Sequence, residues 1–440
     1  MINLLMILII ELVFLYINYL YHKRDFFEPS VITCASLVCG TVFSFIGYDL
    51  YGSHISTTTV AAILIGLVTI SLGSFCAKKE VSLSKLKYGH DYRIIHERVK
   101  IITITTILLT ILYGVDAYRV GMQNGGSGLN AFAYMKHAYT QDGENQKMNL
   151  LIRQGFKFVQ ASGYLNIYYL IRSLVYRQNI QLRKMNTICI LCSVMIVIFS
   201  GSRTEISRLL FAGLLCYSVV FRECKGWSKN GNDNRKMVKK IIPLGALSAF
   251  ILFVTRSVVK TSEVELSNTK SATTYFSFYF GSPVFVLNQK LSHTCFSLKD
   301  FLVGSESGKD LFGQHVYLGD FNYGGNTSTL FELVISNGIL GLIGYYFVRY
   351  LAICIIYQSV VVDSLPNHNR DLLLLIFSML YFAPAFAFYA DCFNMATNFT
   401  SVLTIVIMIA LYKFTTHKVE RKVEENESCS VLSSTVSRNP

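Results

Sequence analysis

Charged side chains are scarce in this sequence. Asp, Glu, Lys and Arg make up 15% of the 440 residues, whereas an ordinary soluble domain carries about 25%. The shortage is not uniform, because stretches of roughly twenty apolar residues recur along the chain. This composition excludes an ordinary soluble domain and indicates a protein embedded in a membrane.

The chain also lacks the alternating strands, about ten residues each, that build a membrane β-barrel. A helix rises about 1.5 Å per residue, so roughly twenty apolar residues in a continuous run cross a hydrocarbon core of about 30 Å. The sequence therefore predicts an all-α, polytopic transmembrane helical bundle with about eleven spans. The expected spans are 3–21, 31–48, 57–77, 101–115, 156–176, 185–200, 206–221, 241–259, 330–357, 372–390 and 398–414.

Several kinds of site are missing as well. Most of the eleven cysteines lie inside predicted spans, so they do not form the disulfide framework of a secreted domain. The Gly-rich segment 123–129 lacks the strand-to-helix context of a nucleotide-binding loop. No spacing of His, Cys and carboxylate residues is typical of a metal site. We therefore expect neither a metal nor another cofactor.

Lysine and arginine are distributed unequally between the two sets of connecting segments. One set contains 25 of them and the other contains 11. Since basic residues are held on the cytoplasmic side, we expect the N-terminus outside and the C-terminus inside. This topology explains the net charge of +13, so nucleic acid is not expected as a partner. The basic set is 22–29, 78–100, 177–184, 222–240, 357–371 and 413–440, and the other set is 48–56, 116–154, 201–205, 256–326 and 391–397.

Two of the expected outer loops are long, at 116–155 and 260–329, whereas the inner loops are mostly short. We expect one transmembrane domain over residues 1–414. The cytoplasmic tail 415–440 is rich in Ser and Glu and is expected to be disordered. Functional residues are often carried by loops that a rigid scaffold positions. The long outer loops therefore indicate chemistry outside the cytoplasm.

The first motif of interest, SGSRTE at 200–205, joins two predicted spans by a tight outer turn. A charge at this position is costly unless it has a partner or a function. Arg203 could extend to the interface or pair with Glu205. Alternatively, together with turn N–H groups and hydroxyls, it binds an anion near the outer surface. The motif by itself leaves both interpretations open.

The second motif is an aromatic segment at 273–291, reading TTYFSFYFGSPVFVLNQKL, which follows Arg256 and Lys260. It is too polar and too short for a span and is interrupted by GSP at 281–283. We expect an amphipathic or re-entrant segment that lies on the outer leaflet. An aromatic belt at the interface is the simpler alternative.

The third motif, at 317–341, is a polar, Gly-rich loop that leads into a predicted span and reads YLGDFNYGGNTSTLFELVISNGILG. Asn or Thr within 326–329 would cap the helix. The helix N-terminus would then face outward, where its partial positive charge is available to a phosphate. A simple N-cap without a ligand is the alternative.

The order of these motifs resembles the O-antigen polymerase family (Wzy, the oligosaccharide repeat-unit polymerases) and the related O-antigen ligases (WaaL). The SGSR turn comes first, the aromatic GSP segment in a long outer loop second, and NTSTLFE leading to SNGILGLIG third. The motifs extend over 200–346, and the topology is similar over the whole chain. Ligases usually carry a His just before the Asn of the third motif, whereas this chain has Gly325. This departure favours a polymerase.

The resemblance implies a membrane glycosyltransferase with a GT-C-like fold in the bacterial inner membrane, whose active site faces the periplasm. It would join oligosaccharide repeat units linked to undecaprenyl pyrophosphate, and no nucleotide sugar would take part. Membrane lipid and a chain-length regulator protein are further expected partners. An O-antigen ligase, or a flippase or other transporter of lipid-linked oligosaccharides, is the alternative.

The leaving group of such a reaction is a pyrophosphate, which needs charge stabilisation more than protonation. Arginine binds phosphate through a planar fork, and an outward helix N-terminus would add to this. The expected pyrophosphate ligands are Arg203, Arg256 and Arg153, and the expected supporting residues are Ser202, Glu205, Asn326 and Tyr275.

The acceptor hydroxyl needs a general base, and histidine is suited to this near neutral pH. Several residues lie in the right region of the sequence, and the sequence does not choose among them. The histidines could equally be solvated loop residues. The candidates are His315, Asp320 and Glu332, with His293 as a further one.

Overall fold

The computed structural model shows a mainly helical chain. Seven described helices are long and apolar enough to cross a membrane, which confirms the predicted class of a polytopic helical protein. They are α1 (Ile2–Tyr21), α2 (Pro29–Ile46), α4 (Thr57–Ala77), α5 (His96–Gln123), α8 (Leu182–Phe199), α9 (Thr204–Cys224) and α17 (Leu333–Val361). The structure describes residues 1–51, 54–77, 92–137, 147–177, 179–202, 204–224, 276–295, 297–314, 316–318, 321–322, 330–361 and 367–418. The span expected at 241–259 lies outside these residues.

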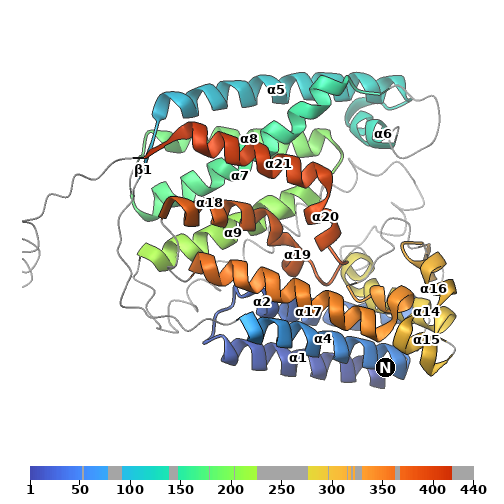
Figure 1. Cartoon of the computed structure of the whole chain (residues 1–440). Coiled ribbons are helices and arrows are strands. Elements are labelled where there is room, and N and C mark those ends of the chain that lie inside the picture. Colours follow the sequence, from blue (N-terminus) through green and yellow to red (C-terminus); the bar gives the residue numbers. More distant parts are fainter. Residues whose placement is uncertain are drawn as a thin grey trace, which may run out of the picture.

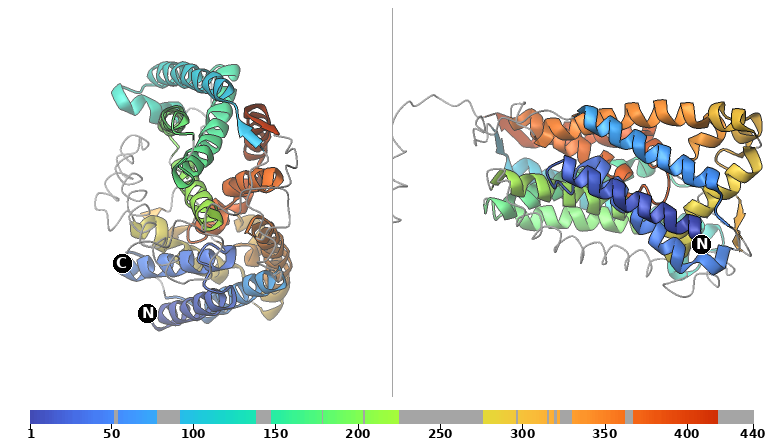
Figure 2. Two further views of the ribbon diagram at one scale, coloured as in Figure 1. Left: turned by 90° about the vertical axis from the view of Figure 1, so that its left-hand side faces the viewer. Right: turned by 90° about the horizontal axis from the view of Figure 1, so that it is seen from below.

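The described helices run along one common direction and form two groups (Figures 1 and 2). Helices α1, α2, α4 and α17 pack together in one group. The second group contains α5, α8, α7 (Leu150–Val175) and α21 (Phe399–Thr415). Helix α9, α18 (Asn367–Leu380) and the short α19 (Phe382–Ala385) lie between them. One buried apolar cluster includes residues of both groups, so the bundle has a shared core.

The connections gather at two opposite ends of the bundle (Figure 1). We call one the β1–β4 end, because β1 (Tyr92–Ile94) pairs there in antiparallel register with β4 (Thr416–Lys418). This end collects the described parts of the connections that are expected in the cytoplasm. Strand β4 falls at the start of the tail that was expected to be disordered, and residues 419–440 lie outside the described part.

The opposite end carries the N-terminus and described parts of the segments that are expected outside the cytoplasm (Figure 1). We call it the α14–α16 end. Its elements are α3 (Tyr48–Tyr51), η2 (Gly128–Asn130), α6 (Ala131–His137), the π-helical turn η3 (Ser277–Gly281), α14 (Ser282–Thr294), α15 (Leu298–Val303), α16 (Glu306–Leu311), β2 (Tyr317–Leu318), β3 (Phe321–Asn322) and α20 (Phe393–Thr397).

The aromatic GSP segment differs from the prediction. The chain does not break at 281–283 but passes from η3 directly into α14, because Pro283 stands in the first turn, where a helix needs no N–H from it. Most of α14 is buried rather than laid on a surface. Gly281 permits this packing, since an added Cβ would lie 2.7 Å from the backbone of Phe43 in α2. The carbonyl of Gly281 accepts a hydrogen bond from Ser44 Oγ at 2.7 Å.

The long span near 330–357 also differs from the prediction. Helix α17 begins at Leu333, so residues 326–329 are too early in the chain to cap it. Gly338 has φ 64° and ψ −174°, which divides α17 by a kink. A Cβ at this position would lie 2.4 Å from the backbone of Leu302 in α15. The close passage of α15 therefore requires a glycine here.

The span expected at 372–390 is interrupted. Helix α18 ends at Leu380, and the four-residue α19 and a series of turns follow it. Pro384 explains the interruption, because it has no N–H to donate to the carbonyl four residues earlier. The segment 386–392 forms a bent connection instead of a straight helix end, and its Phe388 N–H donates to Ser36 Oγ in α2 at 3.0 Å.

Candidate functional site

The SGSRTE motif forms the turn between α8 and α9. Helix α8 ends in a Schellman arrangement, in which Ser202 N–H donates to the Val197 carbonyl at 3.2 Å and Gly201 N–H donates to the Ile198 carbonyl at 3.0 Å. Gly201 has φ +64°, the left-handed conformation that this motif requires. Arg203, the next residue but one, lies outside the described part of the chain. The turn thus reverses the chain within a few residues and begins α9 at Thr204.

Helix α6 covers this turn. Lys136 Nζ donates a hydrogen bond to the Gly201 carbonyl at 3.2 Å. The Phe132 ring stacks on the ring of Phe199, the last residue of α8, with centroids 5.0 Å apart. Helix α6 therefore holds the turn from one side, through the Phe132 ring and the Lys136 ammonium group.

Arg208, one helical turn into α9, carries the central feature of the site. Its Nη1 donates to Glu205 Oε1 at 2.7 Å, and its guanidinium lies 5.0 Å from the centroid of the Phe382 ring. The Arg208 side chain is only 8% exposed. Its Nε and Nη2 find no hydrogen-bond partner in the part of the chain that the structure describes. These two nitrogens form one edge of the planar fork, the edge that can hold two oxygens of a phosphate.

No protein-family model, curated protein or solved structure matches the chain. The chemistry of the site therefore has to follow from its own residues. A buried cation that lacks partners for two donors is unfavourable in isolation. An anion that binds between Arg208 and its neighbours would remove this cost.

The connection between α19 and α20 forms the other side of the site. The Cys392 thiol is buried and close enough to Arg208 to interact with its charge. Burial raises the pKa of Cys392 to about 12, the Asp391 carboxylate adds to this, and Arg208 opposes it. The thiol is therefore neutral near pH 7 and unsuited to act as a thiolate nucleophile.

Asp391 is held in a fixed pair with Arg349 of α17. Arg349 Nη1 lies 3.0 Å from Asp391 Oδ1, and Tyr346 and the Phe393 N–H also donate to this carboxylate. Burial raises the pKa of Asp391, and Arg349 opposes this only in part. The guanidinium of Arg349 also lies 3.5 Å from the centroid of the Tyr345 ring. A second arginine is thus present beside the connection between α19 and α20, but its charge already has a partner.

Glu332, one of the candidate bases, belongs to a separate cluster at the same end. Its carboxylate pairs with Lys290 of α14, and its Oε1 accepts the Gly313 N–H at 3.0 Å. Both side chains are almost fully buried. Burial lowers the pKa of Lys290, and the Glu332 carboxylate opposes this effect. The pair ties the segment around α14–α16 to the start of α17, a geometry that favours a structural role for Glu332.

The other predicted site residues are distributed unevenly. Glu205 pairs with Arg208 at the start of α9, and Ser202 lies in the turn before this helix. Arg153 is exposed in the first turn of α7, and His293 is exposed in the last turn of α14. The remaining predicted residues lie outside the described part of the chain and stay predictions. They are Arg203, Arg256, His315, Asp320, Asn326 and Tyr275.

Arg208, Arg349 and Asp391 were missed by the sequence analysis. Arg208 could have been found, because it follows Glu205 by three residues and so lies on the same face of the helix as the motif. Arg349 and Asp391 are 42 residues apart, and only the bent connection after α18 brings them together. Among the described residues, no three His, Cys, Asp or Glu side chains form a cluster that could hold a metal ion.

Three described arginines at the β1–β4 end are also largely buried, and each of these three is paired with a carboxylate. Asp25 in the loop after α1 accepts from Arg222 at 2.6 Å and from the Tyr357 hydroxyl at 2.7 Å. Two further pairs join α7, α9 and α18 at this end. They are Arg370 with Glu223 and Arg172 with Asp371, each at 2.8 Å.

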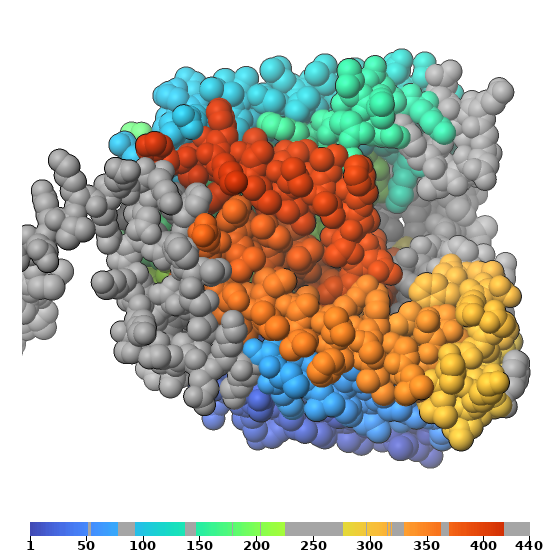
Figure 3. Space-filling view, in the orientation of Figure 1, coloured from blue at the N-terminus to red at the C-terminus, as the bar shows by residue number. Residues whose placement is uncertain are grey.

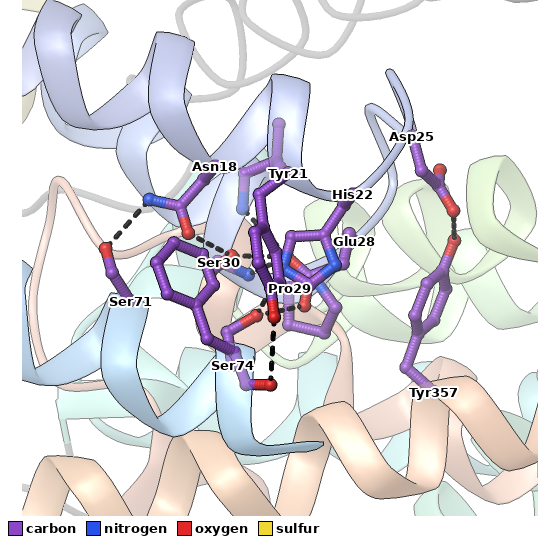
Figure 4. A network of polar contacts seen from close by, with 12 residues as sticks. Asn18, Tyr21, His22, Asp25, Glu28, Pro29, Ser30, Ser71, Ser74 and Tyr357 are labelled. Carbon is purple, nitrogen blue, oxygen red and sulfur yellow. Dashed lines mark hydrogen bonds and ion pairs between the residues drawn. The ribbon is translucent and has the colours of Figure 1, made fainter. Parts of the chain in front are cut away.

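The loop between α1 and α2 extends these contacts (Figure 4). Asn18 Nδ2 donates to Ser71 Oγ at 2.8 Å, and Ser74 Oγ donates to Glu28 Oε1 at 2.8 Å. Glu28 also caps α2 by accepting the Ser30 N–H at 2.8 Å. The polar groups in Figure 4 therefore satisfy one another and link α1, α2, α4 and α17.

Proposed function

We propose that the chain is a membrane glycosyltransferase that joins undecaprenyl-pyrophosphate-linked oligosaccharide repeat units into a polysaccharide chain. The proposal combines the order of the sequence motifs with one structural observation. That observation is the buried Arg208, whose Nε and Nη2 have no hydrogen-bond partner among the described residues. The active site would face the periplasm of a bacterial inner membrane.

The position of Arg208 suits a substrate with a lipid tail and a pyrophosphate. It lies one turn inside α9, at the end of the bundle that is expected to face outward. Figure 3 shows that the surface is hollowed at this end, between the C-terminal helices in red and the blue-green residues of α6 and the start of α7. A pyrophosphate could approach from the outer leaflet while its lipid stays in the bilayer.

The chemistry that this arrangement can perform is stabilisation of a departing pyrophosphate. Negative charge develops on the leaving group as the anomeric carbon bonds to the acceptor hydroxyl. The Nε–Nη2 edge of Arg208 would bind two phosphate oxygens, while Glu205 and the Phe382 ring fix the guanidinium plane. Arg203 and Arg256 stay candidate ligands for the second phosphate. His315, Asp320 and His293 are the candidate general bases, because the ion pair with Lys290 favours a structural role for Glu332.

Arg208→Lys tests this role. A lysine keeps the charge but loses the two-point contact, so we expect repeat-unit extension to slow by about 30- to 1,000-fold, equal to roughly 2–4 kcal/mol of transition-state stabilisation. The assay uses purified full-length protein in liposomes with lipid-linked repeat units and measures product length on gels.

Arg119→Lys is the matched control. Arg119 is also an arginine paired with a carboxylate three residues away, near the same end of the bundle, but its side chain is 56% exposed. We expect it to retain wild-type extension. Wild-type product length in Arg208→Lys would show that Arg208 does not bind the pyrophosphate.

A flippase or other transporter of lipid-linked oligosaccharide is the second candidate. The layer of ion pairs at the β1–β4 end favours it, because a transporter must close one end of its pathway while the other is open. Gene deletion separates the candidates through the surface polysaccharide. Loss of a polymerase leaves a single capped repeat unit, loss of a ligase leaves none, and loss of a flippase accumulates units inside the cell.

A further inference from the structure

A cavity of about 830 Å³ lies at the β1–β4 end, far from Arg208. It is formed where β1 meets α5, where α7 turns into α8, and where β4 leaves α21. None of the motifs discussed above contributes to it. Its lining residues are Arg93, Ile94, Ile95, His96, Glu97, Arg177, Asn179, Ile180, Gln181, Leu182 and His417.

The lining is basic. Arg93 and Arg177 are exposed and form no ion pair with any residue that the structure describes. His96 and His417 add two groups that can bind an anion, and Glu97 is the one acidic residue of the described lining. At the other end of the molecule and in its core, most of the arginines quoted above have a carboxylate partner. The cavity therefore presents two arginines whose positive charge is not neutralised by an ion pair with any described residue.

Backbone groups add to this charge. The cavity reaches the first residues of both α5 and α8, and neither helix has a side-chain cap on its N-terminal N–H groups. The N-terminus of a helix carries a partial positive charge. At α8 the first of these N–H groups are already used, because the Leu182 N–H donates to the Asn179 carbonyl at 3.0 Å and the Arg183 N–H donates to the Ile180 carbonyl at 3.1 Å. The N-terminus of α5 is therefore the one that suits the oxygens of a phosphate group.

The surroundings of the cavity are apolar on the side of the bundle. Ile180 lines the cavity and is 64% exposed. Beyond it, α5 and α8 carry exposed aliphatic residues, among them Ile101, Ile104 and Leu191. A soluble phosphate would use only the basic part. A phospholipid would use both, with its headgroup in the cavity and its acyl chains along α5 and α8.

We propose that this cavity binds the phosphate of an anionic phospholipid headgroup. Arg93 and Arg177 hold the phosphate, and the N-terminus of α5 donates to its oxygens. The bound lipid would join the β1–β4 pair to the α7–α8 connection at the membrane surface. This site is independent of the proposed glycosyltransferase activity, because it lies at the opposite end of the bundle.

The test measures lipid binding to the purified full-length protein in detergent by native mass spectrometry and by thermal stabilisation. The probes are phosphatidylglycerol, phosphatidylcholine and inorganic phosphate. The test variant is Arg93→Gln/Arg177→Gln. The matched control is Lys100→Gln/Lys184→Gln, which removes the same charge from exposed residues of α5 and α8 that do not line the cavity.

We expect wild type and the control to retain phosphatidylglycerol in preference to phosphatidylcholine. The cavity variant should bind phosphatidylglycerol about 10- to 30-fold more weakly, since each basic residue near the membrane surface contributes roughly one order of magnitude or less. Equal weakening in both variants would mean a diffuse charge effect and would overturn the proposal. Stabilisation by inorganic phosphate as strong as by phosphatidylglycerol would overturn the assignment to a lipid.

Discussion

Helix α9 carries a largely buried arginine near each of its ends, and the two arginines differ in their hydrogen-bond partners. Arg222, at the β1–β4 end, pairs with Asp25 of a distant loop, whose carboxylate also accepts from Tyr357. Among the described residues, Arg208, near the α14–α16 end, donates hydrogen bonds only to its helical neighbour Glu205 and leaves two nitrogens without a hydrogen-bond partner. They lie 14 positions apart, about 21 Å along the helix.

This difference separates a structural charge from a functional one. A buried ion pair that joins distant segments is costly to break, because removal of one partner leaves the other charge buried and alone. A buried cation with unused donors adds nothing comparable to the fold. The presence of such an arginine is better explained by a ligand that accepts hydrogen bonds from its unused N–H groups. The following changes test this interpretation, in order of decreasing effect on stability.

Arg222→Leu should have the largest effect. The change leaves Asp25 buried without its cation, so we expect the free energy of unfolding to fall by about 3–5 kcal/mol. The measurement is thermal and SDS-induced unfolding of the purified protein. The double variant Asp25→Leu/Arg222→Leu removes both charges and should recover most of this loss. If the single and double variants are equally unstable, the cost comes from lost packing and not from the ion pair.

Acidification should weaken the same pair. Burial alone raises the pKa of Asp25, but Arg222, Tyr357 and the Phe27 N–H outweigh it, and the net pKa is below the usual 3.8. The folded protein therefore binds this proton less tightly than the unfolded chain. The carboxylate stabilises the fold above about pH 4, and this contribution is lost as the pH falls through the folded pKa.

The double variant Asp25→Leu/Arg222→Leu is again the comparison for this pH dependence. Below about pH 4 its melting temperature should fall less steeply than that of wild type, because it has no Asp25 to protonate. Identical slopes for the two proteins would show that Asp25 is not stabilised by Arg222.

The contrast between Arg222 and Arg208 could be predicted from the sequence only in small part. The span at 57–77 coincides with α4, because a continuous apolar run determines a helix by itself. Arg222 appeared only as one of many basic residues in an inner segment, since its partner is 197 residues away. The site was predicted in part. The turn at 200–205 was recognised, but the arginine whose Nε and Nη2 both lack a partner among the described residues is Arg208, beyond the end of the motif.

The errors near the site have physical causes that local patterns do not contain. Pro384 interrupts the tenth expected span, and the resulting bend carries Asp391 to Arg349. Gly338 kinks α17 because α15 crosses it, and the sequence gives no sign of that crossing. Close approaches between segments distant in the chain depend on tertiary packing, so composition and periodicity do not reveal them.

Gly201→Ala should have an intermediate effect and tests whether the α8–α9 turn positions Arg208. A Cβ at φ +64° is strained and would lie 3.2 Å from the Lys136 side chain, so we expect a loss of about 1–2 kcal/mol in stability. Extension of repeat units should fall with it, because the start of α9 would shift. Gly213→Ala, in the middle of the same helix, is the control and should be neutral or slightly stabilising. Unchanged stability in Gly201→Ala would mean that the turn adapts freely.

Arg208→Leu should have the smallest effect on stability and one of the largest on function. Leucine removes a desolvated cation that has one hydrogen bond, and it leaves Glu205 with a side chain that is still 23% exposed to solvent. We therefore expect the free energy of unfolding to stay within about 1 kcal/mol of wild type or to rise. Extension of lipid-linked repeat units should nevertheless fall by at least about 30-fold, because leucine has no N–H group to donate to the phosphate. The unfolding measurement gives the change in stability, and the extension assay with lipid-linked repeat units gives the change in rate.

A loss of stability as large as that of Arg222→Leu would make Arg208 a structural residue and remove the contrast between the two ends of α9. Retained extension in a stable Arg208→Leu protein would place the pyrophosphate elsewhere, with Arg203 and Arg256 the next residues to change.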